Sequence, residues 1–367
     1  MEAEPRFRAD WAVLGSAFLL TGIGLVLVFS TSSPLTFGKA GADAASYLKR
    51  SLLFAAIGVA CCLALRQVPA EALRRLAYPA LGIAVVFLCL VWIPPFGQAI
   101  KGAHRWIRLA GVGFQPSEVA KFALVIFLAD SLARRGERVR NFVHGYLPNV
   151  LIAGVPILLV LLGPDLGTAA LLAAIVGATA YAGGVRLRHL AASVLPAVPV
   201  VFCLLWFVSF RRERILAFLD PWKYEQTTGF QLVHSLLAFG AGGVWGVGLG
   251  AGHQKLYYLP EAHTDFILSV WAEERGLVGV LAVLAAMAFF VWHGYAIARA
   301  QDDPFRRLLA AGITSWIGLQ AALNALVVTG CVPTKGLPFP FLSYGGTGLV
   351  VSLAAAGVLA GLGRGAR

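Results

Sequence analysis

The sequence predicts an all-α integral membrane protein, organised as a single polytopic domain over residues 1–367. Of the 367 residues, 59% are hydrophobic and 13% are charged. Soluble domains, in contrast, are about 45–50% apolar and about 25% charged. The mean hydropathy is +0.78, and apolar runs of about 20 residues, long enough for a helix to cross a bilayer, recur along the chain. The composition therefore excludes an ordinary soluble enzyme, a disordered chain and a small disulfide-stabilised fold.

About ten apolar runs are long enough to be membrane-spanning helices. In chain order they cover about 11–32, 48–66, 73–94, 116–133, 148–163, 166–184, 189–210, 266–298, 308–330 and 344–363. The fifth and sixth runs are separated only by residues 163–165. The eighth contains Glu273 and Glu274, so we expect its first turns at the outer surface and its spanning part at about 276–298.

The distribution of basic residues predicts that both termini lie in the cytoplasm. With this orientation, the inner segments carry sixteen arginines, whereas the short outer loops carry seven basic residues. An excess of Lys and Arg is typical of cytoplasmic loops. Because the basic residues cluster between apolar runs, the net charge of +12 favours contact with anionic lipid over nucleic acid.

The longest connection, at about 211–265 between the seventh and eighth spans, is then a long extracytoplasmic loop. Residues 230–239 (FQLVHSLLAF) have apolar side chains at helical spacing, which predicts an amphipathic helix in the membrane interface. Seven glycines follow between Gly240 and Gly252. They permit a tight re-entrant segment or a close approach of the backbone to a ligand.

Ionisable residues inside a membrane domain are costly, and they usually serve a function. Five of them fall at the expected outer ends of spans: Glu118, Lys121, Asp165, Asp265 and Lys335. We therefore expect one outward-facing polar site that gathers these side chains.

These residues also have purely structural interpretations. Glu118 and Lys121 are three residues apart and suit an ion pair on a helix surface. Asp165 and Asp265 each suit a helix cap, and Trp106 suits the aromatic belt of a membrane interface. No His, Cys and Glu residues have the spacing of a zinc site, so no metal site is expected.

Five motifs occur in order along nearly the whole chain. They are KGAHRWIRLAGVGFQPSEVAKFALVIFLA (101–129), GPDLGTA (163–169), FLDPWKYEQTTGFQLVHSLLAFGAGGVWGVGLG (218–250), QKLYYLPEAHTDFI (254–267) and PTKGLPFPFLSYGG (333–346). Together they resemble the SEDS family (shape, elongation, division and sporulation). FLDPW, QKLYYLPEAHTDF and PTKGLP look like its division and sporulation branch (FtsW and SpoVE type). Members of the rod-elongation branch (RodA type) usually have Arg where this sequence has Gly113.

This resemblance implies a ten-span, inverting peptidoglycan glycosyltransferase in the cytoplasmic (inner) membrane. Such an enzyme polymerises lipid II, a disaccharide-peptide on undecaprenyl pyrophosphate, at the outer face of the membrane for septal or other cell-wall synthesis. The implied partners are lipid II, membrane lipid, a class B penicillin-binding protein (a transpeptidase), and other division or elongation proteins. No nucleic acid partner and no cofactor are expected, although Mg²⁺ or Mn²⁺ on the pyrophosphate is compatible with the reaction.

The same resemblance implies roles for particular residues. Asp265 matches the essential acidic residue of the family, and we expect it to act as the general base. Residues expected to bind or support the substrate are Glu118, Lys121, Trp106, Arg105, Arg108, Lys101, Asp165, Glu261, His263, Thr264, Lys335 and Ser343. Among these, the cations Lys101, Arg105, Arg108 and Lys121 suit the charge of a departing pyrophosphate.

Three alternative functions remain open: a transporter that flips lipid II, an elongation polymerase of RodA type and a structural scaffold of the division machinery. Transporters hold their charges near the middle of the bilayer, between inverted repeats. In this sequence the charges gather at one expected face and no inverted repeat is visible, which favours the enzyme. A scaffold would not need the carboxylate of Asp265.

Overall fold

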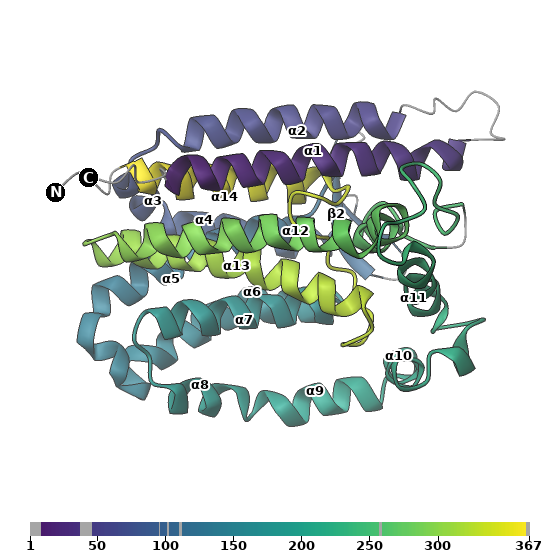
Figure 1. Ribbon diagram of the computed structural model, residues 1–367. Coiled ribbons are helices and arrows are strands. Elements are labelled where there is room, and N and C mark those ends of the chain that lie inside the picture. Colours follow the sequence, from purple (N-terminus) through teal and green to yellow (C-terminus); the bar gives the residue numbers. More distant parts are fainter. Residues whose placement is uncertain are drawn as a thin grey trace.

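The computed structural model describes residues 9–36, 46–94, 96–100, 103–109, 112–256 and 259–364. Most of these residues form long helices that run roughly side by side (Figure 1). The helices are α1 (Ala9–Thr36), α2 (Ser46–Leu65), α3 (Ala70–Arg75), α4 (Ala77–Leu90), α5 (Pro116–Arg135), α6 (Leu147–Leu162), α7 (Leu166–Ala182), α8 (Leu187–Val194), α9 (Ala197–Trp206), α10 (Ser209–Leu219), α11 (Phe230–Gly242), α12 (Ile267–Arg299), α13 (Pro304–Val328) and α14 (Gly346–Arg364), with short helical turns η1 (Gly136–Arg140), η2 (Phe142–Tyr146) and η3 (Trp222–Tyr224).

Each of the ten predicted spans contains a helix or a pair of helices, so the predicted all-α fold is confirmed. The third run is divided into α3 and α4, and the seventh into α8 and α9. Within the described ranges, six helices are long and apolar enough to cross a membrane: Ala9–Thr31, Ser46–Leu65, Phe142–Leu162, Ile267–Arg299, Pro304–Val328 and Gly346–Arg364. The number of spans that cross the bilayer and their orientation stay predictions.

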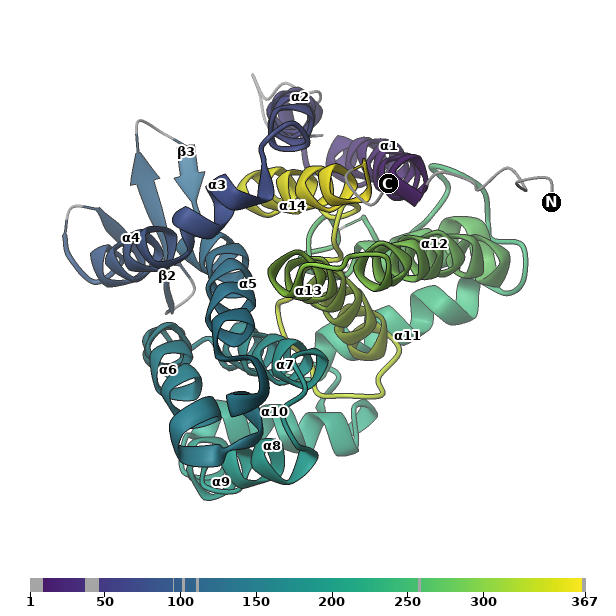
Figure 2. The ribbon, with the colours of Figure 1, turned by 90° about the vertical axis from the view of Figure 1, so that its left-hand side faces the viewer.

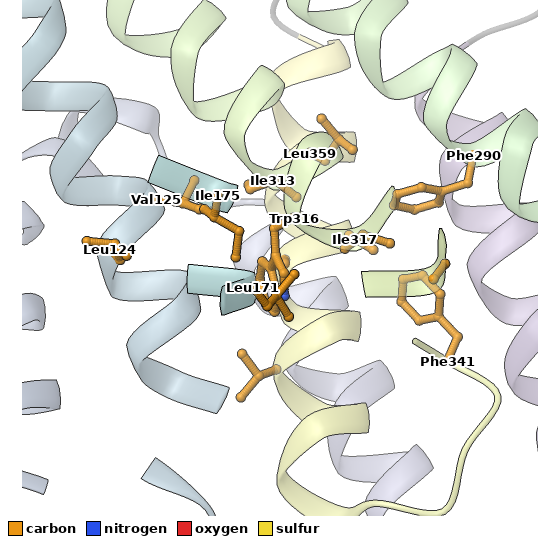
Figure 3. Packing of buried hydrophobic residues seen from close by; sticks show 14 of the residues in the cluster. Leu124, Val125, Leu171, Ile175, Phe290, Ile313, Trp316, Ile317, Phe341 and Leu359 are labelled. Atoms are coloured by element: carbon orange, nitrogen blue, oxygen red, sulfur yellow. The ribbon is translucent and has the colours of Figure 1, made fainter. Parts of the chain in front are cut away.

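The side chains of α13 lie at the centre of the bundle. This helix packs against α5, α7, α12 and α14, and Figure 2 shows this arrangement along the helices. Trp316 of α13 is fully buried, and Figure 3 shows it beside Leu171 of α7. The outer faces of the bundle are apolar as well, since Leu53, Leu151 and Trp292 are 58%, 63% and 68% exposed. Apolar side chains on both the inside and the outside of a bundle are typical of helices that sit in lipid.

A small antiparallel sheet, which the sequence did not predict, lies between α4 and α5. Its strands are β1 (Gly97–Ile100), β2 (Ala103–Leu109) and β3 (Val112–Phe114), in the order β1-β2-β3. In Figure 1, β2 lies at the same end of the bundle as α10 and α11, and the start of α1 lies at the opposite end. The sheet was missed because its strands are only three to seven residues long and show no sustained alternation of apolar and polar side chains.

Helix α12 is interrupted at Gly276, whose φ and ψ are 63° and −164°. The backbone groups freed by this break are hydrogen-bonded to the glycine-rich segment, which we define as residues 243–256. The bonds run from Val247 N to Glu273 O (3.0 Å), Gly248 N to Glu274 O (3.0 Å), Leu277 N to Gly243 O (2.9 Å) and Val278 N to Val244 O (3.2 Å). The segment therefore replaces the intrahelical partners that the break removes.

The side chains of Glu273 and Glu274, in the first turns of the eighth span, are buried inside the protein, at 1% and 0% exposed. The expected position of these turns at the outer membrane surface stays a prediction. The glycine-rich segment covers both side chains. Local sequence could not indicate this, because it does not show where the loop that precedes α12 folds back onto the helix. The predicted helix at 230–239 is present as α11, and its side chains Leu232, Val233 and Ala238 are buried.

Replacing Gly276 with Ala should destabilise the protein. The backbone at this position is in a region that only glycine adopts readily, and a Cβ atom would lie 2.4 Å from Val244 O. We expect the Gly276→Ala variant to lose about 1–3 kcal/mol of unfolding free energy from backbone strain alone. The measurement is the thermal unfolding midpoint of the purified protein in detergent.

The matched control is Gly177→Ala. Gly177 lies inside α7, and a Cβ atom there would meet no atom within 4 Å. Ala is favoured over Gly in a helix by roughly 0.5–1 kcal/mol, so this variant should be at least as stable as the wild type. Equal unfolding midpoints for the two variants would contradict the role assigned to the break in α12.

Candidate functional site

Asp265 lies just before α12, where it is held by α13 and by the loop that follows α13. Nδ2 of Asn324 donates to the main-chain carbonyl of Asp265 (2.7 Å) and to that of Leu337 (2.7 Å). A Cβ atom on Gly336 would be 2.9 Å from Oδ2 of Asp265, so the carboxylate lies directly against this glycine. The N-cap residue of α12 is Phe266. The alternative in which Asp265 is that cap residue is therefore wrong.

Arg214 of α10 brings a cation to this carboxylate. Burial lowers the pKa of the Arg214 guanidinium, the positive charge of Arg105 lowers it further, and the negative charge of Asp265 raises it. The guanidinium stays charged, because arginine is not deprotonated in proteins. Residues from β2, α10 and the start of α12 thus lie within electrostatic range of one another, although they are far apart in sequence.

Arg105 also connects β2 to α7. Its Nε lies 3.3 Å from Oδ2 of Asp165, and its Nη2 donates to the carbonyl of Pro164 (2.9 Å). Asp165 is the N-cap residue of α7 and accepts from the main-chain N–H of Thr168 (3.0 Å) and from its hydroxyl (2.9 Å). Asp165 is therefore both a helix cap and part of the charged site.

Lys335 completes this group of charges. Burial lowers the pKa of the Lys335 amine, the carboxylate of Asp165 raises it, and the cations Arg211 and Arg214 lower it. Lys335 also lies next to Gly167, since a Cβ atom on that glycine would be 3.2 Å from Cβ of Lys335. The amine thus lies within electrostatic range of the Asp165 carboxylate and of two arginines.

We call this group the outer charge cluster, because it lies at the end of the bundle that the sequence predicts to face outward. Its members are Asp165, Asp265, Arg105, Arg211, Arg214 and Lys335. Four cations accompany two carboxylates, so the cluster carries an excess of positive charge. Such an excess in a partly desolvated site favours an anionic ligand such as a phosphate group.

The sequence analysis missed Arg211 and Arg214. A signal was present, because the run Arg211 to Arg214 (RRER) follows the seventh span on the side expected to be outside. Clustered arginines on that side run against the usual charge distribution of membrane proteins. They were missed because basic residues on the outer side were counted only in the short loops, and these two arginines lie in the long connection at 211–265.

Glu118 and Lys121 form a buried layer beneath the cluster. Nζ of Lys121 lies 2.8 Å from the Glu118 carboxylate and donates to Oε1 of Gln320 in α13 (2.7 Å). The ion pair expected from their spacing is present, but it is buried inside the bundle and not on an exposed helix surface, since Lys121 is 0% and Glu118 is 2% exposed. Nε2 of Gln320 donates to the carbonyl of Pro338 (2.8 Å). The loop that contacts Asp265 is thus connected to this buried pair through Gln320.

The predicted residues around Asp265 form a strained and closely packed turn. Glu261 has φ of 59°, an uncommon value for a residue with a side chain. Its carboxylate accepts from the hydroxyl of Thr264 (3.0 Å), and its carbonyl accepts from the N–H of the same residue (3.0 Å). Such strain is often retained where it fixes a functional group.

The ring of His263 packs edge-on against two tyrosine rings, which also contact each other. The ring centroids of Tyr47 and Tyr344 each lie 5.6 Å from that of His263. The N–H of Tyr344 also donates to the carbonyl of His263 (2.9 Å). Ser343, next in the chain, is buried and accepts from the N–H of Phe339 (2.8 Å). This hydrogen bond shapes the loop after α13, and contact of Ser343 with the substrate stays a prediction.

Three predicted residues of the outer sheet have different positions. Trp106 is half-buried against Gly113, where a Cβ atom would be 3.3 Å from its ring. Arg108 is exposed. Because side chains alternate along a strand, Arg108 lies on the face of β2 opposite to Arg105. Lys101 lies outside the described residues.

A small crevice with a volume of about 20 Å³ opens beside the outer charge cluster. Its walls include Leu88 and Val91 near the end of α4 and Leu159 and Val160 of α6, and its polar end is formed by Arg105 and Asp165. Its apolar walls next to an ion pair have the polarity of a surface that contacts a lipid chain with an anionic headgroup. Within the described part of the chain, no three His, Cys, Asp or Glu side chains form a metal site.

Comparisons with known proteins were made by sequence and by structure. The sequence profile of the FtsW/RodA/SpoVE family, described as "Cell cycle protein", matches residues 10–367. A protein of Geobacter sulfurreducens named "Probable peptidoglycan glycosyltransferase FtsW" is 44% identical over 352 residues, which cover 96% of this chain and 94% of the relative. A protein of Nitrosomonas europaea with the same name is 38% identical and covers 95% of this chain and 91% of its own.

Two solved structures have a similar fold. One, described as "Structural coordination of polymerization and crosslinking by a peptidoglycan synthase complex", has a TM-score of 0.80 and 29% identity and covers 97% of this chain and 98% of its own. The other is the rod shape determining protein RodA of Thermus thermophilus, with a TM-score of 0.71, 27% identity and 98% coverage of each chain.

Removing the cation of the buried layer should destabilise the protein strongly. A Lys121→Met substitution leaves the Glu118 carboxylate buried without its counter-charge. Breaking a buried ion pair in this way costs about 3–5 kcal/mol. The measurement is again the thermal unfolding midpoint in detergent.

Arg140→Met is the control for this substitution. Arg140 and Glu137 form an ion pair of 2.9 Å whose side chains are 58% and 82% exposed. Exposed pairs contribute little to stability, so this variant should unfold at the temperature of the wild type. If the two variants lost the same stability, the Lys121 layer would not be the buried support described above.

Proposed function

Because the chain belongs to the FtsW/RodA/SpoVE family of cell cycle proteins, we propose that its outer charge cluster is the active site of lipid II polymerisation. The protein is a multi-pass membrane protein and a peptidoglycan glycosyltransferase, like the relatives that match it over nearly their whole length. The observation that carries the assignment of the site is the convergence of Asp265 with four cations beside an apolar crevice.

Asp265 is the proposed general base of the reaction. The 4-hydroxyl of the GlcNAc of one lipid II attacks C1 of the MurNAc at the end of the growing chain. Asp265 accepts the hydroxyl proton as the new C1–O bond forms. The bond from C1 to the pyrophosphate breaks with its electron pair, and undecaprenyl pyrophosphate leaves. Attack opposite to the leaving group inverts the anomeric centre. The carboxylate of Asp265 lies against Gly336, which has no side chain that could cover it, and this supports the role.

The cations of the cluster are proposed to stabilise the leaving group. Two negative phosphates develop additional charge as the bond to C1 breaks, and fixed cations lower the energy of that state. Arg105, Arg214 and Lys335 come from three different elements, so they surround one region of the site. A divalent cation carried by the pyrophosphate is compatible with this charge distribution and is not required by it.

The apolar surface around the crevice between α4 and α6 is proposed to contact part of the polyprenyl chain. Leu88 and Leu159 line this surface, and its polar end at Arg105 suits the first phosphate. A lipid held in this way keeps its chain in hydrocarbon and its sugars in water. This arrangement requires the outer charge cluster to face the outside of the cytoplasmic membrane, with both termini in the cytoplasm.

The proposed partner is a class B penicillin-binding protein that cross-links the glycan strands. One structural neighbour comes from a complex that couples polymerisation with cross-linking. We further propose a role in division rather than in elongation. The relatives named FtsW reach 44% identity, whereas the RodA structure is 27% identical. The resemblance of the FLDPW and PTKGLP motifs to the division and sporulation branch supports the same proposal.

The Asp265→Asn variant tests the proposed base. This substitution keeps the size of the side chain and removes its capacity to accept the proton. We expect polymerisation of fluorescent lipid II by the purified protein to fall by about 10²–10⁴-fold. The assay is run in detergent, with and without a class B partner.

Asp220→Asn is its control, because Asp220 is an exposed aspartate of the same outer region. It should polymerise at the wild-type rate. Wild-type activity of the Asp265→Asn variant would exclude Asp265 as the base. Since flipping has no meaning in detergent, failure of the wild type to make polymer there with its partner would instead favour the flippase.

The Arg214→Gln variant tests stabilisation of the leaving group. Loss of one fixed donor from such a site lowers kcat by about 10²–10³-fold. Added undecaprenyl pyrophosphate should also inhibit the variant less than it inhibits the wild type. Arg212 lies two residues away on α10 and is exposed, so Arg212→Gln should change neither value. Equal behaviour of the two variants would contradict the proposed role of the cations.

A further inference from the structure

A second group of charges, separate from the outer charge cluster, is buried where the glycine-rich segment meets α12. Nζ of Lys255 lies 2.6 Å from Oε1 of Glu274, and the side chains are 4% and 0% exposed. Ser30 of α1 joins the pair, since it donates to Oε1 of Glu274 (2.7 Å) and accepts from Nζ of Lys255 (2.8 Å). Lys255 also donates to the carbonyl of Gly250 (2.8 Å). One ammonium group thus connects three segments of the chain.

The neighbouring Glu273 holds the same segment through its backbone. Its carboxylate accepts from the N–H groups of His253 (2.7 Å) and Gln254 (3.1 Å). Oε1 of Gln254 is 2.8 Å from Nδ1 of His234 in α11. A Cβ atom on Gly252 would lie 2.8 Å from the Glu273 carboxylate, so glycine is required for this approach. The segment is therefore fixed at consecutive residues up to Lys255.

These contacts close a loop around Asp265. The loop starts at Lys255, which is anchored to Glu274 in the second turn of α12, and it ends where the chain enters α12 at Ile267. Within it, the N–H of Leu259 donates to the carbonyl of Gln254 (2.8 Å). Both ends of the segment that carries Asp265 are thus attached to the same two turns of one helix.

A buried ion pair is a poor source of stability, because the cost of desolvating both charges offsets most of their attraction. Apolar residues would hold the segment to α12 at least as strongly. The ion pair adds a geometric requirement, because the ammonium group is hydrogen-bonded to Glu274, Ser30 and Gly250 at the same time. Such a contact fixes the position of the segment more narrowly than apolar packing does.

We propose that Lys255 is a positioning residue for the reaction at Asp265, acting through its ion pair with Glu274 and its contact with Ser30. The inference rests on the proposed function, because the reaction is the one assigned to Asp265 above. Lys255 itself does not contact the substrate. It holds the loop so that the carboxylate of Asp265 stays against Gly336 and within range of Arg214.

The test uses the full-length protein with its partner and the double variant Lys255→Met/Glu274→Gln. This variant removes the ion pair without leaving either charge buried and unpaired. We expect kcat for lipid II polymerisation to fall by roughly 10-fold or more, with KM changed less than 2-fold. The single variant Lys255→Met should show a loss of kcat at least as large. A Ser30→Ala variant keeps the ion pair and should lose activity by less than either.

Arg66→Met is the matched control. Arg66 and Asp10 form a largely buried ion pair (3.1 Å, side chains 12% and 9% exposed) that involves α1 but lies at the opposite end of the bundle. Its loss should lower the unfolding midpoint and leave kcat unchanged at temperatures where the protein is folded. If kcat fell equally in the control, or if the double variant kept its wild-type kcat, the positioning role would be overturned.

Hydrogen exchange separates this inference from the proposed function. Amide exchange of residues 259–266 should be faster in the double variant than in the wild type and unchanged in Arg66→Met. This measurement needs no activity. Wild-type exchange of this stretch in the double variant overturns the positioning role, whereas a wild-type protein that makes no polymer overturns the proposed function alone.

Discussion

The structure depends on one constraint: inside a bilayer, backbone and charged groups find their partners within the protein, because no water is available to them. The break in α12 at Gly276 shows how this constraint is met. Two carbonyls and two N–H groups that leave the helix ladder are taken up by the glycine-rich segment. The segment is then held in place, and with it the turn that leads to Asp265. The need to pair these backbone groups thus also fixes the carboxylate of Asp265, the proposed general base.

The loop between α13 and α14 links the two polar levels of the bundle. Gln320 binds it at Pro338, and Asn324 binds it at Leu337 while also holding the backbone of Asp265. The Lys121 ion pair shares Gln320 with this loop. The buried layer is therefore not an isolated charge pair. It supports the loop that carries Lys335 into the outer charge cluster. A substitution in the buried pair can therefore affect the position of Lys335 through the amide side chains of Gln320 and Asn324.

Apolar length predicted the helices well because the bilayer imposes it on every span separately. It could not predict contacts between spans. The convergence of Asp165, Asp265 and Lys335 was expected, since the topology put all three at one face. The contribution of Arg214, the burial of Glu274 and the short sheet that carries Arg105 were not expected. Each of these depends on how distant segments meet, and local pattern contains no information about that. The assignment of the family, in contrast, followed from motifs that keep their order over the whole chain.

The two groups of charges at this end of the bundle differ in what neutralises them. Around α12, two carboxylates face one ammonium group, and the excess negative charge is met by main-chain N–H groups of the glycine-rich segment. The charges of that group are all neutralised by other groups of the protein, as is typical of a structural ion pair. In the outer charge cluster the excess is positive and is drawn from β2, α10 and the loop after α13. Gathering like charges from separate elements is unfavourable unless an anion joins them. The pyrophosphate of the proposed substrate would supply that anion, and this argues that the cluster, rather than the buried pair, meets the substrate.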